Sequence, residues 1–480
     1  MWQPVLMIDG FILSVLGLTM LIPAAFDIYE RHLLQSPFLI AAFLTIFIGV
    51  SLFLANRVRI NRISLKQGYL VTCACWVSVA VFASVPFYLY GIGGNAASAL
   101  FEGTSGITGT GATIIFDIEN LPRSVIFWRS LLNGLGGIGI IIFAVAMLPF
   151  LGIGGMQIFQ RENADAGNKF MPKFVDMAKW IIVVYLSLVL LCAVLLQWCG
   201  MTWFDAVNHA LSAVATGGFS TKNNSIAFFD SAVIEAVLSL FMLIGSLPVT
   251  FYIILLRNRE IEPFRFGQAK QFLQTVLLLI LLISLWLSFT NDMPFLTSLR
   301  KSSFNIISVI TTTGFASADF LSWGIWTAVF FTLLSLHGGC IGSTTGSIKT
   351  MRWQVLFSYI YKVMASAINP NRVVPVKVGE VPVSDKVVVS VLVYILLFFI
   401  TIAVCALGLN FLGYDFITSF SAAIASVTNT GPGVAPEIGI SGNYAFFSSE
   451  AKILLCAAMM FGRLEILTLI VVFTPSFWKN

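Results

Sequence analysis

The chain alternates long apolar runs with shorter polar segments. Two apolar runs, at about residues 5–26 and 37–56, open the sequence. Each can cross a bilayer as a helix, because a hydrocarbon core of roughly 30 Å takes about 20 apolar residues. From there one pattern recurs: an apolar run, a segment of about a dozen residues with a Thr- and Gly-rich end, a polar stretch and a second apolar run. The pattern predicts an all-α polytopic membrane protein.

The recurring pattern divides the chain into a helix pair and four repeats. The predicted boundaries are 1–66 for the N-terminal transmembrane pair, 67–176 for repeat one, 177–269 for repeat two, 270–385 for repeat three and 386–480 for repeat four. The long runs of the successive repeats are about 68–91 and 124–150, 178–200 and 231–256, 271–290 and 322–363, and 387–412 and 448–474. Two spans in each repeat, added to the first pair, predict ten membrane spans.

The short segment of every repeat ends in a similar run of small residues. These runs are Ser105–Gly111, Ser212–Gly218, Ser308–Gly314 and Ala425–Gly431, and their last residues, the loop glycines, are 107, 96 and 117 residues apart. A segment too short to cross must enter the membrane and turn back, which is tolerated only where protein or a water-filled cavity surrounds it. Four copies in matching register predict a ring around a central pore.

The composition of these runs fits a selectivity filter. Rings of backbone carbonyls can replace the water of a permeating cation, and glycine permits the positive φ that turns consecutive carbonyls inward. The candidate cation-binding residues are Thr110, Gly111, Gly217, Gly218, Thr313, Gly314, Thr430 and Gly431. Interhelical packing is the alternative role for Gly, Ser and Thr, but four runs in matching register disfavour it. Two positions depart from the pattern: Gly217 stands where the other repeats have Thr, and Pro432 follows Gly431.

Composition and charge agree with a membrane protein of defined orientation. With 58% hydrophobic and 10% charged residues, soluble classes are excluded. The segments expected on one side are basic, through Arg57, Arg59, Arg62, Lys66, Arg161, Lys169, Lys173, Lys179, Arg257, Arg259, Arg265, Lys270, Arg372, Lys377 and Lys479. The positive-inside rule makes that side cytoplasmic and puts both termini there.

The opposite segments carry more acids than bases. The acids are Asp27, Glu30, Glu102, Asp117, Glu119, Asp205, Asp230, Asp292, Asp319, Asp415, Glu437 and Glu450. An acidic mouth concentrates cations, whereas ordinary solvated carboxylates are the alternative.

Four helix/pore-loop/helix repeats with one glycine each resemble the Trk/Ktr/HKT superfamily of potassium transporters. The additional N-terminal pair makes the TrkH type the most similar. The resemblance implies a potassium-uptake protein of the cell inner membrane, with potassium at the candidate residues above. It also implies a homodimer that works with a separate cytosolic ring of RCK-type subunits, which bind NAD, ATP or ADP, on the basic face.

No nucleotide-binding motif is readable in the chain itself. Gly342–Lys349 has no Lys directly after a glycine and is not a Walker loop. We therefore expect no cofactor in this chain, no nucleic-acid partner, and lipid around the helices.

The second long run of repeat three is interrupted by Leu336–Ser347. Its twelve positions hold four glycines and four hydroxyl residues, which predicts unwound backbone inside the bundle. By resemblance this is the intramembrane loop that gates such transporters, through Gly338, Gly339, Gly342, Ser343, Thr344, Thr345 and Gly346. A close-packing glycine face, as in Gly134–Gly137, is the alternative.

Arg463 lies in the middle of the last long run. A cation at that depth costs at least about 2.5–3.5 kcal/mol, so it must face water, a carboxylate or backbone carbonyls. By resemblance it projects into the conduction path below the filter and belongs to the gate. A structural ion pair is the alternative, although Glu465 is two residues on and points elsewhere on a helix.

These observations predict a gated potassium-uptake pore. A proton- or sodium-coupled symporter is the alternative; it needs carboxylates or histidines along the path, and beyond Glu465, His209 and His337 few are found. For both histidines polar packing is favoured over proton relay. An enzyme is not expected, because no nucleophile, base or metal constellation is readable.

Overall fold

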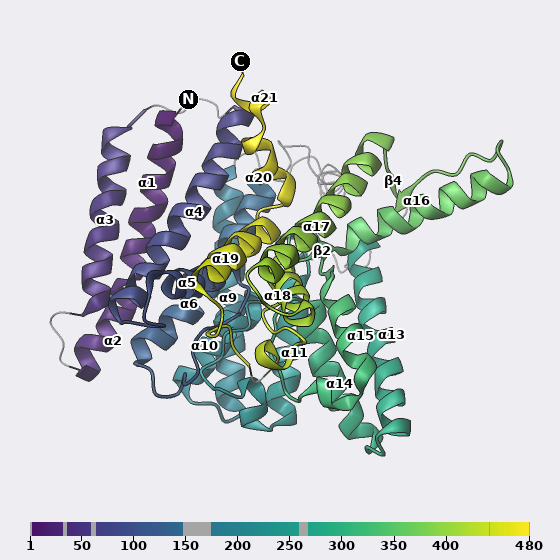
Figure 1. The fold of residues 1–480 in the computed structure, drawn as a ribbon, viewed down its shortest axis with the longest axis horizontal. Helices are drawn as coiled ribbons and strands as arrows, with labels where there is room; N and C mark the ends of the chain where they lie inside the picture. Colours follow the sequence, from purple (N-terminus) through teal and green to yellow (C-terminus); the bar gives the residue numbers. More distant parts are fainter. Residues whose placement is uncertain are drawn as a thin grey trace.

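Long helices run from one end of the molecule to the other, and both termini lie at the same end (Figure 1). The computed structural model describes residues 2–31, 36–58, 64–146, 174–258, 267–379, 381–440 and 442–479. Several basic residues named above lie outside these ranges, namely Arg59, Arg62, Arg161, Lys169, Lys173, Arg259 and Arg265.

The N-terminal pair forms a close helical hairpin. It consists of α1 (Trp2–Thr19), α2 (Leu21–Arg31) and α3 (Pro37–Ala55). Ser36 caps α3 by accepting a hydrogen bond from the N–H of Phe38. Gly10 of α1 faces Gly49 of α3, and a Cβ on Gly10 would lie 2.6 Å from the Gly49 carbonyl oxygen. The absence of side chains therefore lets the two backbones touch.

Each repeat places a short helix between longer ones. Repeat one has α4 (Leu65–Leu89), α5 (Ala96–Thr108) and α6 (Arg123–Ala146); repeat two has α9 (Phe174–Trp198), α10 (Trp203–Val214), α11 (Ala232–Ser246) and α12 (Val249–Asn258). Repeat three has α13 (Gly267–Thr290), α14 (Phe295–Ile310), α15 (Ile325–Ser335), β1 (His337–Gly338), β2 (Ile348–Lys349), α16 (Thr350–Ile368), β3 (Lys377–Val378) and β4 (Val381–Pro382). Repeat four has α17 (Asp385–Phe411), α18 (Phe416–Thr428), α19 (Ser449–Arg463), α20 (Ile466–Phe473) and α21 (Pro475–Trp478).

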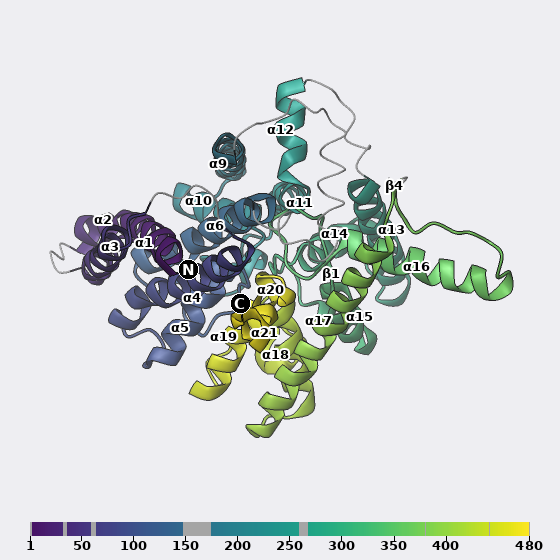
Figure 2. The same ribbon diagram turned by 90° about the horizontal axis from the view of Figure 1, so that it is seen from above.

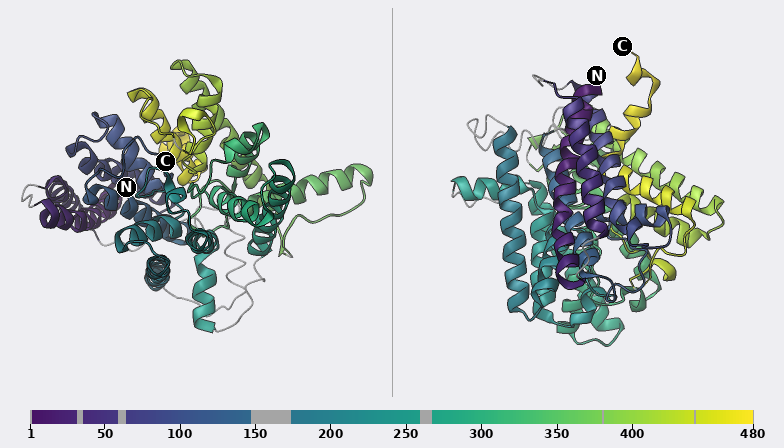
Figure 3. Two further views of the ribbon diagram at one scale, coloured as in Figure 1. Left: turned by 90° about the horizontal axis from the view of Figure 1, so that it is seen from below. Right: turned by 90° about the vertical axis from the view of Figure 1, so that its left-hand side faces the viewer.

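The short helices α5, α10, α14 and α18 have 13, 12, 16 and 13 residues. Asn95, Thr202 and Asp415 cap three of them by accepting a backbone N–H, which explains where these helices begin. The second long part of each repeat packs against the short helix of the next: α6 on α10, α11 on α14, α15 on α18, and α19 on α5. The repeats therefore succeed one another around a centre and close on themselves (Figure 2 and Figure 3).

Two of the expected spans are broken rather than continuous. In the described part of the chain, seven helices are long and apolar enough to cross a membrane, or up to nine if each bent pair counts as one span. The pairs are α11 with α12, bent by 94°, and α19 with α20, bent by 112°. The runs at 231–256 and 448–474, each predicted as one span, therefore consist of two helices that meet at a sharp bend. The remaining expected span contains α15, which has eleven residues before the interruption at Leu336.

The two breaks have different physical causes. At the first, Pro248 lacks an N–H and Leu247 before it is extended, so a helix cannot continue. At the second no proline is present. Gly462 lies against the carbonyl of Val427, and Glu465 adopts a φ of 60°. The first break could be predicted from Pro248, whereas the second depends on packing.

Candidate functional site

The four short helices end in the same turn. In repeat one, the N–H of Thr110 donates to the carbonyl of Ser105, and the N–H of Gly109 donates to the carbonyl of Gly106. The other three repeats have the same two bonds, and the one that spans five residues is 2.8–3.0 Å long in all four. These are the two hydrogen bonds of a Schellman motif. The residue two places before each loop glycine is left-handed: Gly109 (φ 65°), Thr216 (φ 50°), Thr312 (φ 57°) and Asn429 (φ 56°). The sequence repeat is therefore also a repeat of backbone geometry.

The loop glycines themselves are left-handed as well. Their φ values are 78° at Gly111, 76° at Gly218, 82° at Gly314 and 92° at Gly431. Residues with a Cβ rarely adopt such angles, so the prediction of positive φ at these four positions is confirmed.

The four loops touch in a closed ring. A Cβ added to a loop glycine would overlap the carbonyl oxygen that precedes the glycine of another repeat: Gly111 would meet Gly217, Gly218 would meet Thr313, Gly314 would meet Thr430, and Gly431 would meet Thr110. The order of contacts is one, two, three, four and back to one. All eight residues predicted for the loops are thereby brought together around one centre.

Threonine pairs brace three of the loops. The hydroxyls of Thr108 and Thr110 lie 2.7 Å apart, and the equivalent pairs Thr311 with Thr313 and Thr428 with Thr430 lie 2.8 and 2.9 Å apart. Repeat two has Ala215 and Gly217 at these positions. A Cβ on Gly217 would lie 2.5 Å from the side-chain amide carbon of Asn133 on α6, so the exceptional glycine makes room for that amide.

A second set of polar side chains anchors the backbone after each loop glycine. Glu102 accepts from the hydroxyl of Thr113 and the N–H of Ile114, and His209 pairs with the hydroxyl of Ser220. In the other repeats Asn305 donates to Ser317, and Ser421 accepts from the N–H of Val434. Sequence reasoning missed this set as a group. The available signal was its register, since Glu102, His209 and Asn305 each precede their loop glycine by nine residues.

The sequence predicts an outer-surface position for Glu102 and polar packing for His209. Glu102 is fully buried and forms a 2.7 Å ion pair with Arg129, whose Nη1 also donates to the Ser220 carbonyl. The expectation that Glu102 lies on an acidic outer surface was therefore wrong, because its register puts it behind the loop. His209 uses both ring nitrogens, the other one bonding to the Asp205 carbonyl, as polar packing requires.

The Leu336–Ser347 loop lies directly against the ends of the short helices. Its residues 338–347 are buried, and β1 pairs in parallel with β2 beside it. The hydroxyl of Thr344 donates to the Val214 carbonyl, and the N–H of Gly346 donates to the hydroxyl of Thr312. A Cβ on Gly346 would overlap the carbonyl of Thr428. The loop thus contacts repeats two, three and four just below their turns.

The broken span of repeat two also holds this loop. The N–H of Cys340 donates to the carbonyl of Ser246, and the N–H of Val249 donates to the carbonyl of Gly342, at 2.9 and 3.1 Å. The backbone groups freed where α11 and α12 part therefore find partners in the loop. The break and the loop therefore satisfy each other's backbone hydrogen-bonding groups.

Arg463 faces the remaining repeat. A Cβ on Gly109 would lie 3.4 Å from its Nη2, so the guanidinium lies beside the turn of repeat one. The side chain is buried, and its three nitrogens have no hydrogen-bond partner among the described residues. Glu465 pairs instead with the buried Arg352, whose guanidinium stacks on the ring of Tyr394 at 3.6 Å. In the described part of the chain, Arg463 has no ion-pair partner, which disfavours the structural alternative.

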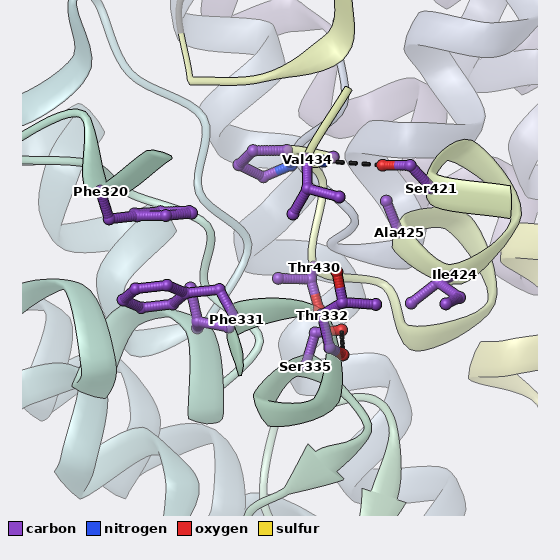
Figure 4. A pocket seen from close by; sticks show the side chains of 12 residues that line it. Phe320, Phe331, Thr332, Ser335, Ser421, Ile424, Ala425, Thr430 and Val434 are labelled. Atoms are coloured by element: carbon purple, nitrogen blue, oxygen red, sulfur yellow. Dashed lines mark hydrogen bonds between the residues drawn. The ribbon is translucent and has the colours of Figure 1, made fainter. Parts of the chain in front are cut away.

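A small, partly open pocket lies between repeats three and four. Phe320 and Phe331 border it on one side, and Thr430 and Val434 of the loop lie opposite (Figure 4). The bond from the Val434 N–H to Ser421, at 2.6 Å, runs along its edge. This seam is packed less completely behind the loop. Among the described residues, no group of three or more His, Cys, Asp or Glu could hold a metal ion.

Comparisons with known proteins match most or all of the chain. A family model described as TrkH, cation transport protein, matches residues 34–480. The chain is 38% identical to the Trk system potassium uptake protein TrkI of Halomonas elongata, over 100% of this chain and 97% of that protein. It is 32% identical to the Trk system potassium uptake protein TrkH of Vibrio parahaemolyticus over the full length of both. The crystal structure of the potassium transporter TrkH from Vibrio parahaemolyticus superimposes with a TM-score of 0.92 at 31% identity, covering 100% of both chains.

The Arg352–Glu465 pair generates a prediction about stability. Glu465→Gln leaves Arg352 buried without its counter-charge, and we expect a loss of about 3–5 kcal/mol in the free energy of unfolding. Asp385→Asn is the matched control, because Asp385 pairs with Lys362 at 3.2 Å with its side chain 85% exposed. The control should change stability by about 0–1 kcal/mol. Thermal unfolding in detergent measures both; equal melting temperatures would contradict the prediction.

Proposed function

The chain belongs to the TrkH family of cation transport proteins, and from this membership we propose that it takes up potassium through the ring of four loops. It is a multi-pass membrane transporter and not an enzyme. The single observation that carries the proposal is the closed ring itself, in which the carbonyls of Thr110, Gly217, Thr313 and Thr430 each lie against a glycine of another repeat.

The ring has the chemistry of a filter for a monovalent cation. Carbonyl oxygens converging on one axis replace the hydration shell of the ion without a buried charge. The short helices α5, α10, α14 and α18 all end at the ring, and each directs about half a negative charge toward it. Thr110, Gly111, Gly217, Gly218, Thr313, Gly314, Thr430 and Gly431 form the cation-binding set. Repeat two lacks the threonine brace, so the filter is uneven and its rejection of sodium is less sharp.

The gate in this proposal consists of the Leu336–Ser347 loop and Arg463. The loop blocks the underside of repeats two, three and four, and the guanidinium blocks repeat one. Gly338, Gly339, Gly342, Ser343, Thr344, Thr345 and Gly346 are its loop residues. Because Arg463 has no partner in the described part of the chain, its charge repels a cation that leaves the filter.

The proposal extends to topology and partners. Trp2 stacks on Trp478, which supports a common side for both ends of the chain. Lys66, at the start of α4, donates to the carbonyl of Lys479 on the same side. We assign that side to the cytoplasm of a cell inner membrane. There a homodimer would meet a separate ring of RCK-type subunits that bind NAD, ATP or ADP. The relatives are named as parts of a Trk system, which supports further subunits.

Coupled symport is the weaker alternative. Of the three candidate coupling groups, Glu465 is held by Arg352 and His209 bonds through both ring nitrogens. His337 lies between the rings of Phe272 and Trp353, and its Nδ1 has no hydrogen-bond partner among the described residues. A carboxylate that already faces a counter-charge and an imidazole with both nitrogens bonded have no free site for a coupling proton or sodium ion. Gated passive flow is therefore the proposed mechanism.

The filter is tested by Gly314→Ser. At a φ of 82° beside the Thr430 carbonyl, the new side chain must displace the ring, so we expect at least a tenfold loss of potassium preference over sodium. Rubidium uptake into proteoliposomes, with sodium as competitor, measures this. Gly139→Ser on α6 is the control, because open space surrounds that position. An unchanged ion preference in Gly314→Ser would remove the filter assignment.

The gate is tested by Arg463→Ala. Removing the unpartnered charge below the ring should lower the barrier to ion passage by about 1 kcal/mol or more, and so raise rubidium flux several-fold. Arg463→Lys keeps the charge and should stay near wild type. Lys362→Ala, at a half-buried cation on α16, controls for loss of charge away from the ring. Equal flux in Arg463→Ala and wild type would count against a pore-facing role.

A further inference from the structure

Tyr444 forms hydrogen bonds with two of the four loops. Its hydroxyl donates to the carbonyl of Gly431 at 2.8 Å, and its backbone N–H donates to the carbonyl of Thr113, also at 2.8 Å. The residue is 2% exposed and lies in the segment between α18 and α19. One residue of repeat four thus binds the loop of repeat four and the loop of repeat one.

This contact distinguishes the Gly431 carbonyl, which follows the Thr430 carbonyl of the ring, from the carbonyls of the other three loop glycines. Within the described residues, Gly431 is the one loop glycine whose carbonyl accepts a hydrogen bond from a side chain. It also has the largest φ of the four, 92° against 76–82°, and it is the one followed by a proline. The hydrogen bond, the backbone angle and the neighbouring residue all make repeat four the distinctive quarter of the ring.

Two neighbouring aromatic side chains hold the phenol group of Tyr444 in place. The phenol ring lies 5.3 Å from Phe101 of α5 and 5.7 Å from Phe447, measured between ring centroids. These contacts fix the direction from which the hydroxyl donates, so the bond is a rigid tether and not an exchangeable surface contact.

The tether lies at the seam where the ring closes. Gly431 meets Thr110 there, and these two residues belong to the first and last repeats of the chain. No short connection joins these repeats, so noncovalent bonds alone set the distance between their loops. Lys452 supports the same seam, because its Nζ donates to the hydroxyl of Ser98 at 3.0 Å.

We propose that Tyr444 is a specificity-determining residue that holds the Gly431 carbonyl at a fixed distance from the axis. A carbonyl oxygen has two lone pairs, so one serves the tether and one remains for the ion. A tethered carbonyl cannot move inward to coordinate a smaller ion. The carbonyls then compensate less than the full cost of removing the hydration shell of sodium. This inference rests on the proposed potassium function and adds the residue that limits sodium entry.

The test is Tyr444→Phe, which keeps the aromatic side chain and removes its hydroxyl. We expect potassium preference over sodium to fall about three- to tenfold, the effect of losing one hydrogen bond. The preference is the ratio of the sodium and potassium concentrations that halve rubidium uptake by the full-length protein in proteoliposomes. The ratio should change through the apparent affinities, while the maximal rate and the melting temperature stay near wild type. A merely structural tyrosine would change the melting temperature and leave the ratio intact.

The matched control is Tyr414→Phe. Tyr414 belongs to the same aromatic cluster, 4.7 Å from Phe447, and its hydroxyl accepts the N–H of Ser448 without contacting the ring of carbonyls. Its ratio should equal that of wild type. If Tyr444→Phe fails to fold, Phe447→Leu decides, because it loosens the phenol while keeping the hydroxyl and should lower the ratio by a smaller factor.

The outcomes separate this inference from the function on which it rests. A lowered ratio in Tyr444→Phe with a wild-type ratio in Tyr414→Phe supports the tether. An unchanged ratio in a Tyr444→Phe protein that transports potassium overturns the tether alone. A wild-type protein that carries no potassium overturns the proposed function and the tether together.

Discussion

The contact on which the structure depends is the approach of each loop glycine to a backbone carbonyl of another repeat. Four such contacts, from Gly111, Gly218, Gly314 and Gly431, close a ring at a distance that no Cβ would allow. Each glycine is also left-handed, so its position is restricted both by space and by φ. A ring of bare backbone inside a membrane is stable only if its polar groups find partners, because an unpaired group in low dielectric is costly. The surrounding side chains supply these partners.

Different residues perform the same task in each repeat. Behind the loops, Glu102, His209 and Asn305 stand at one register position, and Ser421 replaces them one residue earlier in repeat four. Between repeats, Arg129 reaches the Ser220 carbonyl and Tyr444 reaches that of Thr113. A carboxylate, an imidazole, an amide and a hydroxyl can all satisfy nearby backbone or hydroxyl groups. The backbone of the ring is therefore nearly fourfold, while its supports are not, and the asymmetry of the pore originates in the supports.

Below the ring, three interruptions of regular helix fit together. The Leu336–Ser347 loop forms hydrogen bonds with the backbone groups on both sides of Pro248. The bend after Arg463 brings Glu465 to Arg352 at the start of α16. Buried charges are costly unless paired, and here the carboxylate of Glu465 lies near Arg352 and Lys349. Lys349 donates to the Thr345 hydroxyl within the loop, so the loop, α16 and the bend share one polar cluster. Movement of any one of them disturbs the others, which is the physical basis for treating them as one unit.

The sequence by itself determined the features that follow from local rules. Apolar run lengths predicted where the spans lie, and the register of the four glycines predicted both their positive φ and their meeting in a ring. The register of Glu102 and the presence of Pro248 are also readable in the sequence. Only the tertiary structure decided that Gly217 makes room for Asn133, that Glu465 chooses Arg352, and that Tyr444 holds Gly431. These pairs are far apart in the chain, and which of them meet is decided by how whole helices pack.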